Sequence, residues 1–227
     1  MSADPKQELR VWFPEISEEQ WERLDAFCAY FREWNERMNL VSRKDIDQFE
    51  RHHLAHALAL TKFYKFRDRC RVLDVGSGGG LPGLPLAICF PRVQFYLCDS
   101  IQKKMKAVAD MIERLGLKNA EAVCKRAETL ESKWDYVTGR AVTALPRFIG
   151  WTRKNIRGGG PEDFPHGILY WKGSLYKEEL ESLKLEPHRV MDIHDEIADS
   201  YFEEKYIIHL NTHALQRLPS SAVEPIG

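Results

Sequence analysis

The stretch VLDVGSGGGLPG, from Val72 to Gly83, decides the fold of this chain. An apolar run ends at Asp74, and five of the eight residues from Gly76 to Gly83 are glycines. A buried strand that leads into a glycine-rich turn and a helix is typical of α/β proteins that hold nucleotide-like cofactors. The stretch therefore predicts a cofactor site where this strand ends, and it leaves open which cofactor the turn holds.

Short apolar stretches alternate with amphipathic ones after the first strand. Strands are expected at 71–75, 93–98, 120–124, 136–138, 167–171, 188–193 and 205–210. Helices are expected at 84–90, 100–115, 145–156 and 175–183. Strand–helix alternation predicts an α/β fold with a mostly parallel, doubly wound sheet of seven strands. Only a polar loop separates the last two strands, which predicts a C-terminal antiparallel hairpin at the sheet edge.

Ahead of the first strand, residues 17–40 have the pattern of an amphipathic helix. Ser17 and Gln20 form a capping box. Apolar side chains then recur every three or four residues, at Trp21, Leu24, Phe27, Cys28, Phe31, Trp34 and Met38. Residues 46–64 repeat this pattern more weakly. We therefore expect an N-terminal helical extension over 1–66, a core domain over 67–215 and a tail over 216–227.

The composition is that of an ordinary globular protein, since 44% of the 227 residues are hydrophobic and 30% are charged. No apolar run approaches the roughly 18 residues that a membrane span requires, and the N-terminus MSADPKQELR lacks the apolar core of a signal peptide. The five cysteines show neither a CxxC pair nor zinc-ligand spacing. We expect a cytoplasmic monomer with reduced thiols, no membrane partner and no metal.

The net charge of −1 hides an asymmetry along the chain. Residues 37–172 carry a net charge of +10, whereas residues 1–36 carry −5 and residues 173–227 carry −6. A basic middle around the glycine turn indicates a polyanionic partner such as RNA. The alternative is that charge fluctuates along the chain and mixes again in three dimensions.

Two cofactor fingerprints overlap in the glycine-rich turn. The stretch 78–83 satisfies GxGxxG, and Asp99 follows about 20 residues later, as in dinucleotide sites. Against this reading, the strand ends two residues too early and Pro82 removes a backbone donor from the turn. The stretch 74–80, acid-x-Gly-x-Gly-x-Gly, resembles instead the pattern of class I S-adenosylmethionine (SAM)-dependent methyltransferases, which have a Rossmann-like fold.

The turn suits SAM, because glycines let the backbone pass close beneath the ligand. SAM has no pyrophosphate, so the turn does not need a full set of backbone N–H donors. Two acidic residues have two possible roles each. Asp74 either orients the turn or meets the methionine amino group. Asp99 either accepts hydrogen bonds from both ribose hydroxyls or caps the helix that follows.

Further motifs from about Trp34 to Leu210 carry a more specific resemblance. They are WNERMNLVS (34–42), RHHLAHAL (51–58), DVGSGGGLPGLPLA (74–87), LCDSIQKKMK (97–106), KRAETL (125–130), GRAV (139–142) and WKG (171–173). With them the chain resembles the bacterial small-subunit (16S) ribosomal RNA guanine-N7 methyltransferases, also called the glucose-inhibited division protein B family (RsmG/GidB).

The resemblance implies SAM as cofactor and small-subunit ribosomal RNA, or a small-subunit particle, as substrate. It implies that Ala127 and Glu128 flank the adenine, that Asp99 and Ser100 hold the ribose, and that Arg140 lies beside the reacting centre. The full set expected to hold SAM is Asp74, Gly76, Gly78, Leu81, Asp99, Ser100, Ala127, Glu128 and Arg140.

Two features depart from the family pattern. Ala55 stands three residues after His52, where the family often has an aspartate, and this weakens any role assigned to that helix. The segment 158–166 is longer and richer in turn residues than expected, which indicates either a mobile flap or an ordinary loop.

Guanine N7 carries an in-plane lone pair, so methyl transfer needs in-line positioning rather than a general base. Arg140 is the first catalytic candidate, because its fork matches the Hoogsteen edge of guanine. Lys172, at the end of the fifth strand, is the second. The alternatives are an ion pair of Arg140 with an acid such as Glu128, and a structural role for Lys172. His52, His53 and His56 have no further ligand pattern, so no metal site is expected.

These observations predict a SAM-dependent methyltransferase that acts on N7 of a guanine in small-subunit ribosomal RNA. Three other classes stay open. They are an NAD-linked oxidoreductase, a SAM-dependent methyltransferase of another acceptor, and a non-catalytic RNA-binding or ribosome-assembly protein on the same fold.

Overall fold

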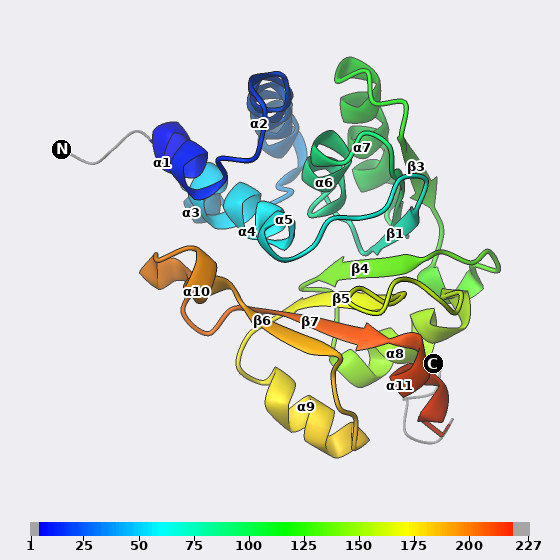
Figure 1. Cartoon of the computed structure of the whole chain (residues 1–227). Helices are drawn as coiled ribbons and strands as arrows, with labels where there is room; N and C mark the ends of the chain where they lie inside the picture. Colours follow the sequence, from blue (N-terminus) through cyan, green and yellow to red (C-terminus); the bar gives the residue numbers. More distant parts are fainter. Residues whose placement is uncertain (1–4, 220–227) are drawn as a thin grey trace.

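The computed structural model describes residues 5–219, which form one seven-stranded sheet with helices on both faces (Figure 1). The strands are β1 (Arg71–Val75), β2 (Gln94–Asp99), β3 (Ala120–Cys124), β4 (Tyr136–Arg140), β5 (Gly167–Lys172), β6 (Arg189–Asp192) and β7 (Tyr206–Asn211). Their order is β3-β2-β1-β4-β5-β7-β6. β1 to β5 pair in parallel, whereas β7 is antiparallel to both neighbours. The predicted α/β class and C-terminal antiparallel pair are confirmed.

One face of the sheet carries α6 (Gly83–Cys89) and α7 (Gln102–Arg114), and the N-terminal α2 (Glu18–Met38) and α4 (Ala55–Leu58) pack over them. The other face carries α8 (Leu145–Thr152), α9 (Tyr176–Leu183) and α11 (Thr212–Arg217). The remaining α-helices are α1 (Pro5–Trp12), α3 (Arg43–Ile46), α5 (Leu60–Phe63) and α10 (Ile193–Glu196). Over residues 5–219 no helix is long and apolar enough to cross a membrane.

Helix α2 begins and packs as its sequence predicts. The Ser17 N–H donates to Gln20 Oε1 at 2.9 Å, and the Gln20 N–H donates back to Ser17 Oγ, so the capping box is present. The buried side chains of α2 are Trp21, Leu24, Phe27, Cys28, Phe31 and Asn35. All of these except the polar Asn35 join one hydrophobic core with side chains of α6 and α7, so this part of the expected N-terminal extension shares the core of the sheet.

The weaker apolar pattern at 46–64 does not form one helix. The chain breaks there into α3, the π-helical turn η1 (Phe49–Leu54), α4 and α5. At the end of η1 the Ala55 N–H donates to the Glu50 carbonyl, five residues back, so this turn carries one residue more than an α-helical turn. Hydrophobic periodicity does not reveal a single extra residue, which explains why the sequence indicated a continuous pattern.

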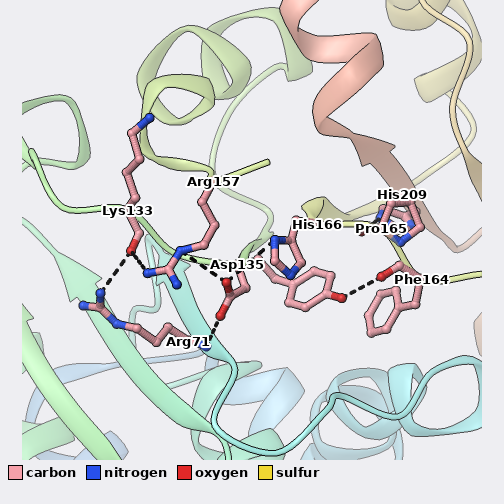
Figure 2. Close-up of polar contacts among 9 residues, drawn as sticks. Arg71, Lys133, Asp135, Arg157, Phe164, Pro165, His166 and His209 are labelled. Atoms are coloured by element: carbon pink, nitrogen blue, oxygen red, sulfur yellow. Dashed lines mark hydrogen bonds and ion pairs between the residues drawn. The ribbon is translucent and has the colours of Figure 1, made fainter. Parts of the chain in front are cut away.

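The segment 158–166 leads directly into the start of β5 at Gly167. It therefore lies at the amino ends of the parallel strands. The ring of Phe164 is buried and stacks on Tyr64 and Tyr136, with centroids 3.8 and 4.5 Å away. The Tyr136 hydroxyl donates to the Phe164 carbonyl at 2.7 Å (Figure 2). Of the two readings left open, these contacts support an ordinary packed loop, on the sheet edge opposite the glycine turn.

A charged cluster beside this loop ties it to the sheet (Figure 2). The buried Asp135 carboxylate accepts from the Arg71 N–H at 2.7 Å, and Arg157 Nε lies 3.3 Å from its other oxygen. The Arg71 and Arg157 side chains also donate to the Lys133 carbonyl. These bonds hold the connection from β4 to β5 in place.

Candidate functional site

The glycine-rich turn lies where β1 and β2 end. The N–H groups of Gly76 and Ser77 donate to the Cys98 carbonyl at 2.8 and 3.1 Å, which fixes the turn to the end of β2. Gly76 has a φ of 67°, a conformation that favours glycine. A Cβ atom added at Gly79 would lie 2.5 Å from the Phe31 ring of α2. The turn therefore packs directly against the N-terminal helices.

Asp74 lies beneath this turn with no exposed surface. One carboxylate oxygen accepts from Thr138 Oγ1 at 2.7 Å, and the other accepts from the Gly83 N–H at 3.1 Å. Burial raises the pKa of this carboxyl to about 7. Asp74 lines neither of the two pockets described next. Its contacts are those of a residue that orients the turn, the first of its two expected roles.

A pocket of about 220 Å³ lies beside the turn at the carboxyl ends of β2 and β3. We call it the carboxylate pocket; it is lined by Val75, Gly76, Cys98, Asp99, Ser100, Lys125, Arg126, Ala127, Glu128, Val142 and Trp151. Five of the nine residues expected to hold SAM line it. The expected cofactor set left out Val142, although it ends the GRAV motif, and Trp151, which lies in α8 and belongs to no quoted motif.

Both acids of the carboxylate pocket are held in place. Asp99 accepts from the Gly78 N–H at 3.2 Å and from the Ile101 N–H at 2.9 Å, so it joins the glycine turn to the start of α7. A carboxylate offers about four acceptor positions, so two protein donors leave capacity for a ligand. The Glu128 side chain is 15% exposed and pairs with Arg126 at 3.5 Å. Asp99 is not the N-cap of α7, because that position is Ile101, which makes no side-chain capping bond; Asp99 lies two residues before it and lines the pocket.

A second pocket of about 290 Å³ lies on the other side of Gly76. We call it the imidazole pocket; it is lined by Phe31, Leu40, Val41, His53, His56, Gly76, Ser77, Gly78, Gly79, Leu81, Arg140, Ala141 and Tyr201. It brings together Gly78, Leu81 and Arg140, three of the four remaining residues expected to hold SAM; the fourth, Asp74, lies beneath the turn. The N-terminal helices supply one of its walls, which the sequence reasoning did not predict.

Arg140 ends β4, which runs two residues further than the sequence indicated. Its Nη1 donates to the His53 carbonyl at 3.5 Å, a long hydrogen bond. Over residues 5–219 no carboxylate forms an ion pair with it, so the alternative of a pair with Glu128 is wrong. Burial lowers the pKa of Arg140 to about 10, and the guanidinium still carries its charge at neutral pH. The pocket therefore contains a cation without a counter-ion.

Lys172, the second catalytic candidate, pairs with Glu179 of α9 at 2.7 Å. It lines a third pocket of about 420 Å³, the lysine pocket, with His56, Arg140, Ala141, Thr143, Tyr170, Trp171, Gly173, Ser174, Glu203, Glu204 and Lys205. His56, Arg140 and Ala141 also line the imidazole pocket, so the two are neighbours. The ion pair agrees with the structural alternative for Lys172. The Lys172 charge lies in the lysine pocket, beside the imidazole pocket.

The histidines of 52–56 lie in different surroundings. The His52 ring stacks on Tyr201 with a centroid distance of 3.7 Å. The His53 and His56 rings line the imidazole pocket instead, and Ala55 is buried and apolar. Three positions after His52 this chain has the apolar Ala55. Three positions after His53 it has a polar residue, His56. The spacing was visible in the sequence, but the pocket that both rings share was not.

Over residues 5–219 no group of three or more His, Cys, Asp or Glu side chains is arranged to hold a metal ion. The cysteines at 28, 70, 89, 98 and 124 are free thiols. Burial raises the pKa of Cys98, the one cysteine in the carboxylate pocket, to about 11.

Comparisons with known proteins bear on this site. A family model described as rRNA small subunit methyltransferase G matches residues 20–200. The ribosomal RNA small subunit methyltransferase G of Flavobacterium johnsoniae is 39% identical over 203 residues, 89% of this chain and 96% of that protein. The protein of the same name from Cytophaga hutchinsonii is 38% identical over 89% of this chain and 97% of its own length.

Among solved structures, a SAM-dependent methyltransferase from Aquifex aeolicus superposes with a TM-score of 0.51. It covers 67% of this chain and 87% of that chain at 13% sequence identity. At this identity the likeness concerns the fold alone, and the fold is that of the class I SAM-dependent methyltransferases.

Proposed function

This chain belongs to the rRNA small subunit methyltransferase G family, and from that premise we propose that it transfers the methyl group of SAM to N7 of a guanine in small-subunit (16S) ribosomal RNA. The observation that carries the proposal is the pair of pockets that share Gly76. One pocket has the acids that suit a nucleoside, and the other has an unpaired cation that suits a guanine edge.

The carboxylate pocket fits the adenosine part of SAM. Asp99 would accept from the ribose hydroxyls, with Ser100 beside it, and Ala127 and Glu128 would flank the adenine. A Cβ atom added at Gly78 would meet only the Gly76 carbonyl, at 3.9 Å, so the turn leaves open space above it. Gly76, Gly78 and Leu81 would line the passage from the carboxylate pocket to the imidazole pocket, with Asp74 holding the turn from below.

SAM supplies an electrophilic methyl group, so the protein has to position the acceptor. The lone pair of guanine N7 lies in the ring plane, and no residue needs to remove a proton before transfer. Arg140 would donate to guanine O6 and fix the angle at which N7 approaches. The charge of Lys172 is balanced by Glu179. Lys172 would line the lysine pocket, through which the RNA would enter.

The substrate suggests where the protein works. We propose that it acts in the cytoplasm, where bacterial ribosomal RNA is made, and that it acts as a monomer. Between residues 5 and 219 the exposed large hydrophobic side chains are only Val11, Ile101 and Leu175, which do not amount to an apolar interface.

The decisive experiment transfers a labelled methyl group from SAM to bacterial small subunits and, separately, to their extracted RNA. Nucleoside analysis of the product is expected to give 7-methylguanosine, and the better of the two substrates shows which state of the RNA is recognised. Label in another nucleoside, or no label in either substrate while SAM binds, would refute the proposed reaction.

A matched pair of variants links this activity to the carboxylate pocket. Asp99→Ala removes the ribose contact and is expected to weaken SAM binding roughly 10- to 100-fold in calorimetry. Asp68→Ala removes an exposed acid that pairs with Arg92. Both residues lie just before the amino ends of β1 and β2, opposite the carboxylate pocket, so the variant is expected to leave SAM affinity unchanged. Equal affinity of both variants would remove Asp99 from the cofactor site.

A further inference from the structure

Three buried polar atoms without a hydrogen-bond partner belong to residues of the imidazole pocket. They are Nε2 of His53, Nε2 of His56 and Oγ of Ser77, whose side chain is only 2% exposed. Buried polar groups are nearly always paired, so each unpaired one requires an explanation. Three such atoms around one pocket indicate a ligand that supplies their partners.

The two imidazoles are fixed to the edge of the sheet through their own backbones. Arg140, at the end of β4, donates to the His53 carbonyl, and Trp171 Nε1, in β5, donates to the His56 carbonyl at 2.8 Å. Because two strand ends hold two consecutive helical turns, the histidine side chains are set against the pocket before any ligand arrives.

Apart from the hydroxyls of Ser77 and Tyr201, the pocket offers no other side-chain oxygen acceptor. None of its lining residues is Asp, Glu, Asn or Gln. Arg140 can only donate hydrogen bonds. Burial and the nearby Arg140 charge lower the pKa of His53 to about 4, and they hold the pKa of His56 well below its usual value. Both rings are therefore neutral at physiological pH, and each keeps one nitrogen lone pair.

We propose that His53 and His56 read the target guanine, accepting hydrogen bonds from its N1–H and 2-amino group while Arg140 donates to O6. This inference rests on the proposed function. Adenine presents a lone pair at N1, a C–H at position 2 and an amino group at position 6. In the same position its C2–H would offer one imidazole no hydrogen bond, and its 6-amino group would direct a donor at Arg140.

The competing occupant of these contacts is the methionine end of SAM, which the same glycine turn serves. His56 and Arg140 favour the base, because both also line the lysine pocket, and no residue of the glycine turn does. They therefore lie on the side of the imidazole pocket that faces away from the turn.

The test compares variants that keep the ring shape with variants that keep an acceptor. His53→Phe and His56→Phe remove the nitrogens, whereas His53→Asn and His56→Asn retain a carbonyl oxygen. The control is His213→Phe on α11, where the histidine is exposed and belongs to none of the three pockets. For each variant we would measure SAM affinity, the unfolding midpoint, and kcat and KM for methyl transfer to small subunits or their RNA.

We expect each Phe variant to lose roughly 10- to 100-fold in kcat/KM for RNA at saturating SAM, as the loss of a buried hydrogen bond implies. SAM affinity and the unfolding midpoint should stay near wild type, and the Asn variants should recover part of the rate. Full activity in both Phe variants would overturn the inference, and so would a matching loss of SAM affinity, which would assign the histidines to the cofactor. Absence of 7-methylguanosine with the unaltered protein would instead refute the proposed function.

Discussion

Arg140 shows how much one residue depends on contacts that a sequence does not reveal. Its position after the fourth strand was predictable, and so was a role near the reacting centre. Whether its charge was already neutralised was not predictable, because that depends on which acids the folded chain brings near. Glu128 pairs with Arg126 instead, and among residues 5–219 no carboxylate pairs with Arg140. Lys172 shows the reverse, since α9 returns to place Glu179 beside it.

The first prediction concerns Arg140→Ala. We expect turnover to fall at least roughly 100-fold, because a donor aimed at the base is lost. The unfolding midpoint should stay level or rise, because the variant removes a half-buried charge that no carboxylate of residues 5–219 balances. Arg140→Lys should recover little activity, since an ammonium lacks the planar fork.

Steady-state kinetics and thermal unfolding check this prediction, with Arg92→Ala as the control. Arg92 is 78% exposed and pairs with Asp68, far from the pockets. A large drop in the midpoint of Arg140→Ala, with activity lost in proportion to the unfolded fraction, would assign Arg140 a structural role.

The second prediction concerns His209 of β7, which is fully buried. Its Nε2 lies 2.9 Å from the Pro165 carbonyl, which can only accept, so Nε2 donates there and Nδ1 accepts from the Tyr64 hydroxyl. Burial lowers the pKa of His209 to about 3. The unfolded chain takes up a proton near pH 6.5, and the folded chain does not until far lower pH. Stability is therefore lost as the pH falls below about 6.5.

The slope from one such histidine approaches about 1.4 kcal/mol per pH unit. Urea unfolding between pH 8 and pH 5 measures it. His209→Gln, which keeps a neutral donor for Pro165, should give a shallower slope than the unaltered protein. His213→Gln, at an exposed site, should leave the slope unchanged; identical slopes for all three proteins would contradict the assignment.

At the scale of elements, the sequence predicted the regular parts well and the irregular parts poorly. The capping box of α2, the strands and the glycine turn follow from local patterns. The π-helical turn η1 does not, because one extra residue leaves the apolar spacing almost unchanged. The imidazole pocket depends on η1 and α4 lying beside the ends of β4 and β5, which is a matter of tertiary packing.

The third prediction tests the contact between α2 and the glycine turn. In Gly79→Ala the new methyl group would meet Phe31 at 2.5 Å and Leu40 at 3.2 Å. Such overpacking is expected to cost about 1–3 kcal/mol in urea unfolding. SAM affinity should fall as well, because the turn has to shift.

Gly158→Ala is the matched control for Gly79→Ala, since a Cβ atom there would meet nothing within 4 Å. Its stability and SAM affinity should equal those of the unaltered protein. If Gly79→Ala behaved like this control, α2 could not be packed on the turn as the structure has it.

At the scale of the whole molecule, the expected division into 1–66, 67–215 and 216–227 remains a prediction. Residues 220–227 of the tail lie outside the described residues. The hydrophobic core argues for a single folding unit, because Phe31, Phe49 and Leu58 belong to the same buried cluster as Phe95 and Met105. The N-terminal helices also form one wall of the imidazole pocket.

The fourth prediction follows from this shared core. A chain that begins at residue 67 would expose the apolar faces of α6 and α7 that α2 and α4 cover. We expect it to lack a cooperative urea transition and to bind no SAM. A fragment that unfolds cooperatively and binds SAM like the full chain would establish 1–66 as a separate unit.

The extra residue in η1 also constrains how this protein can change over generations. One extra codon in a helix that neighbouring packing holds at both ends would produce such a π-helical turn. Removing that codon would restore the ordinary helix, but every side chain on one side of the deletion would rotate by about 100° relative to the other. Either Phe49 would leave the core, or His53 and His56 would leave the pocket. Substitutions in this segment can therefore accumulate one at a time, whereas a change in its length has to be compensated in a single step.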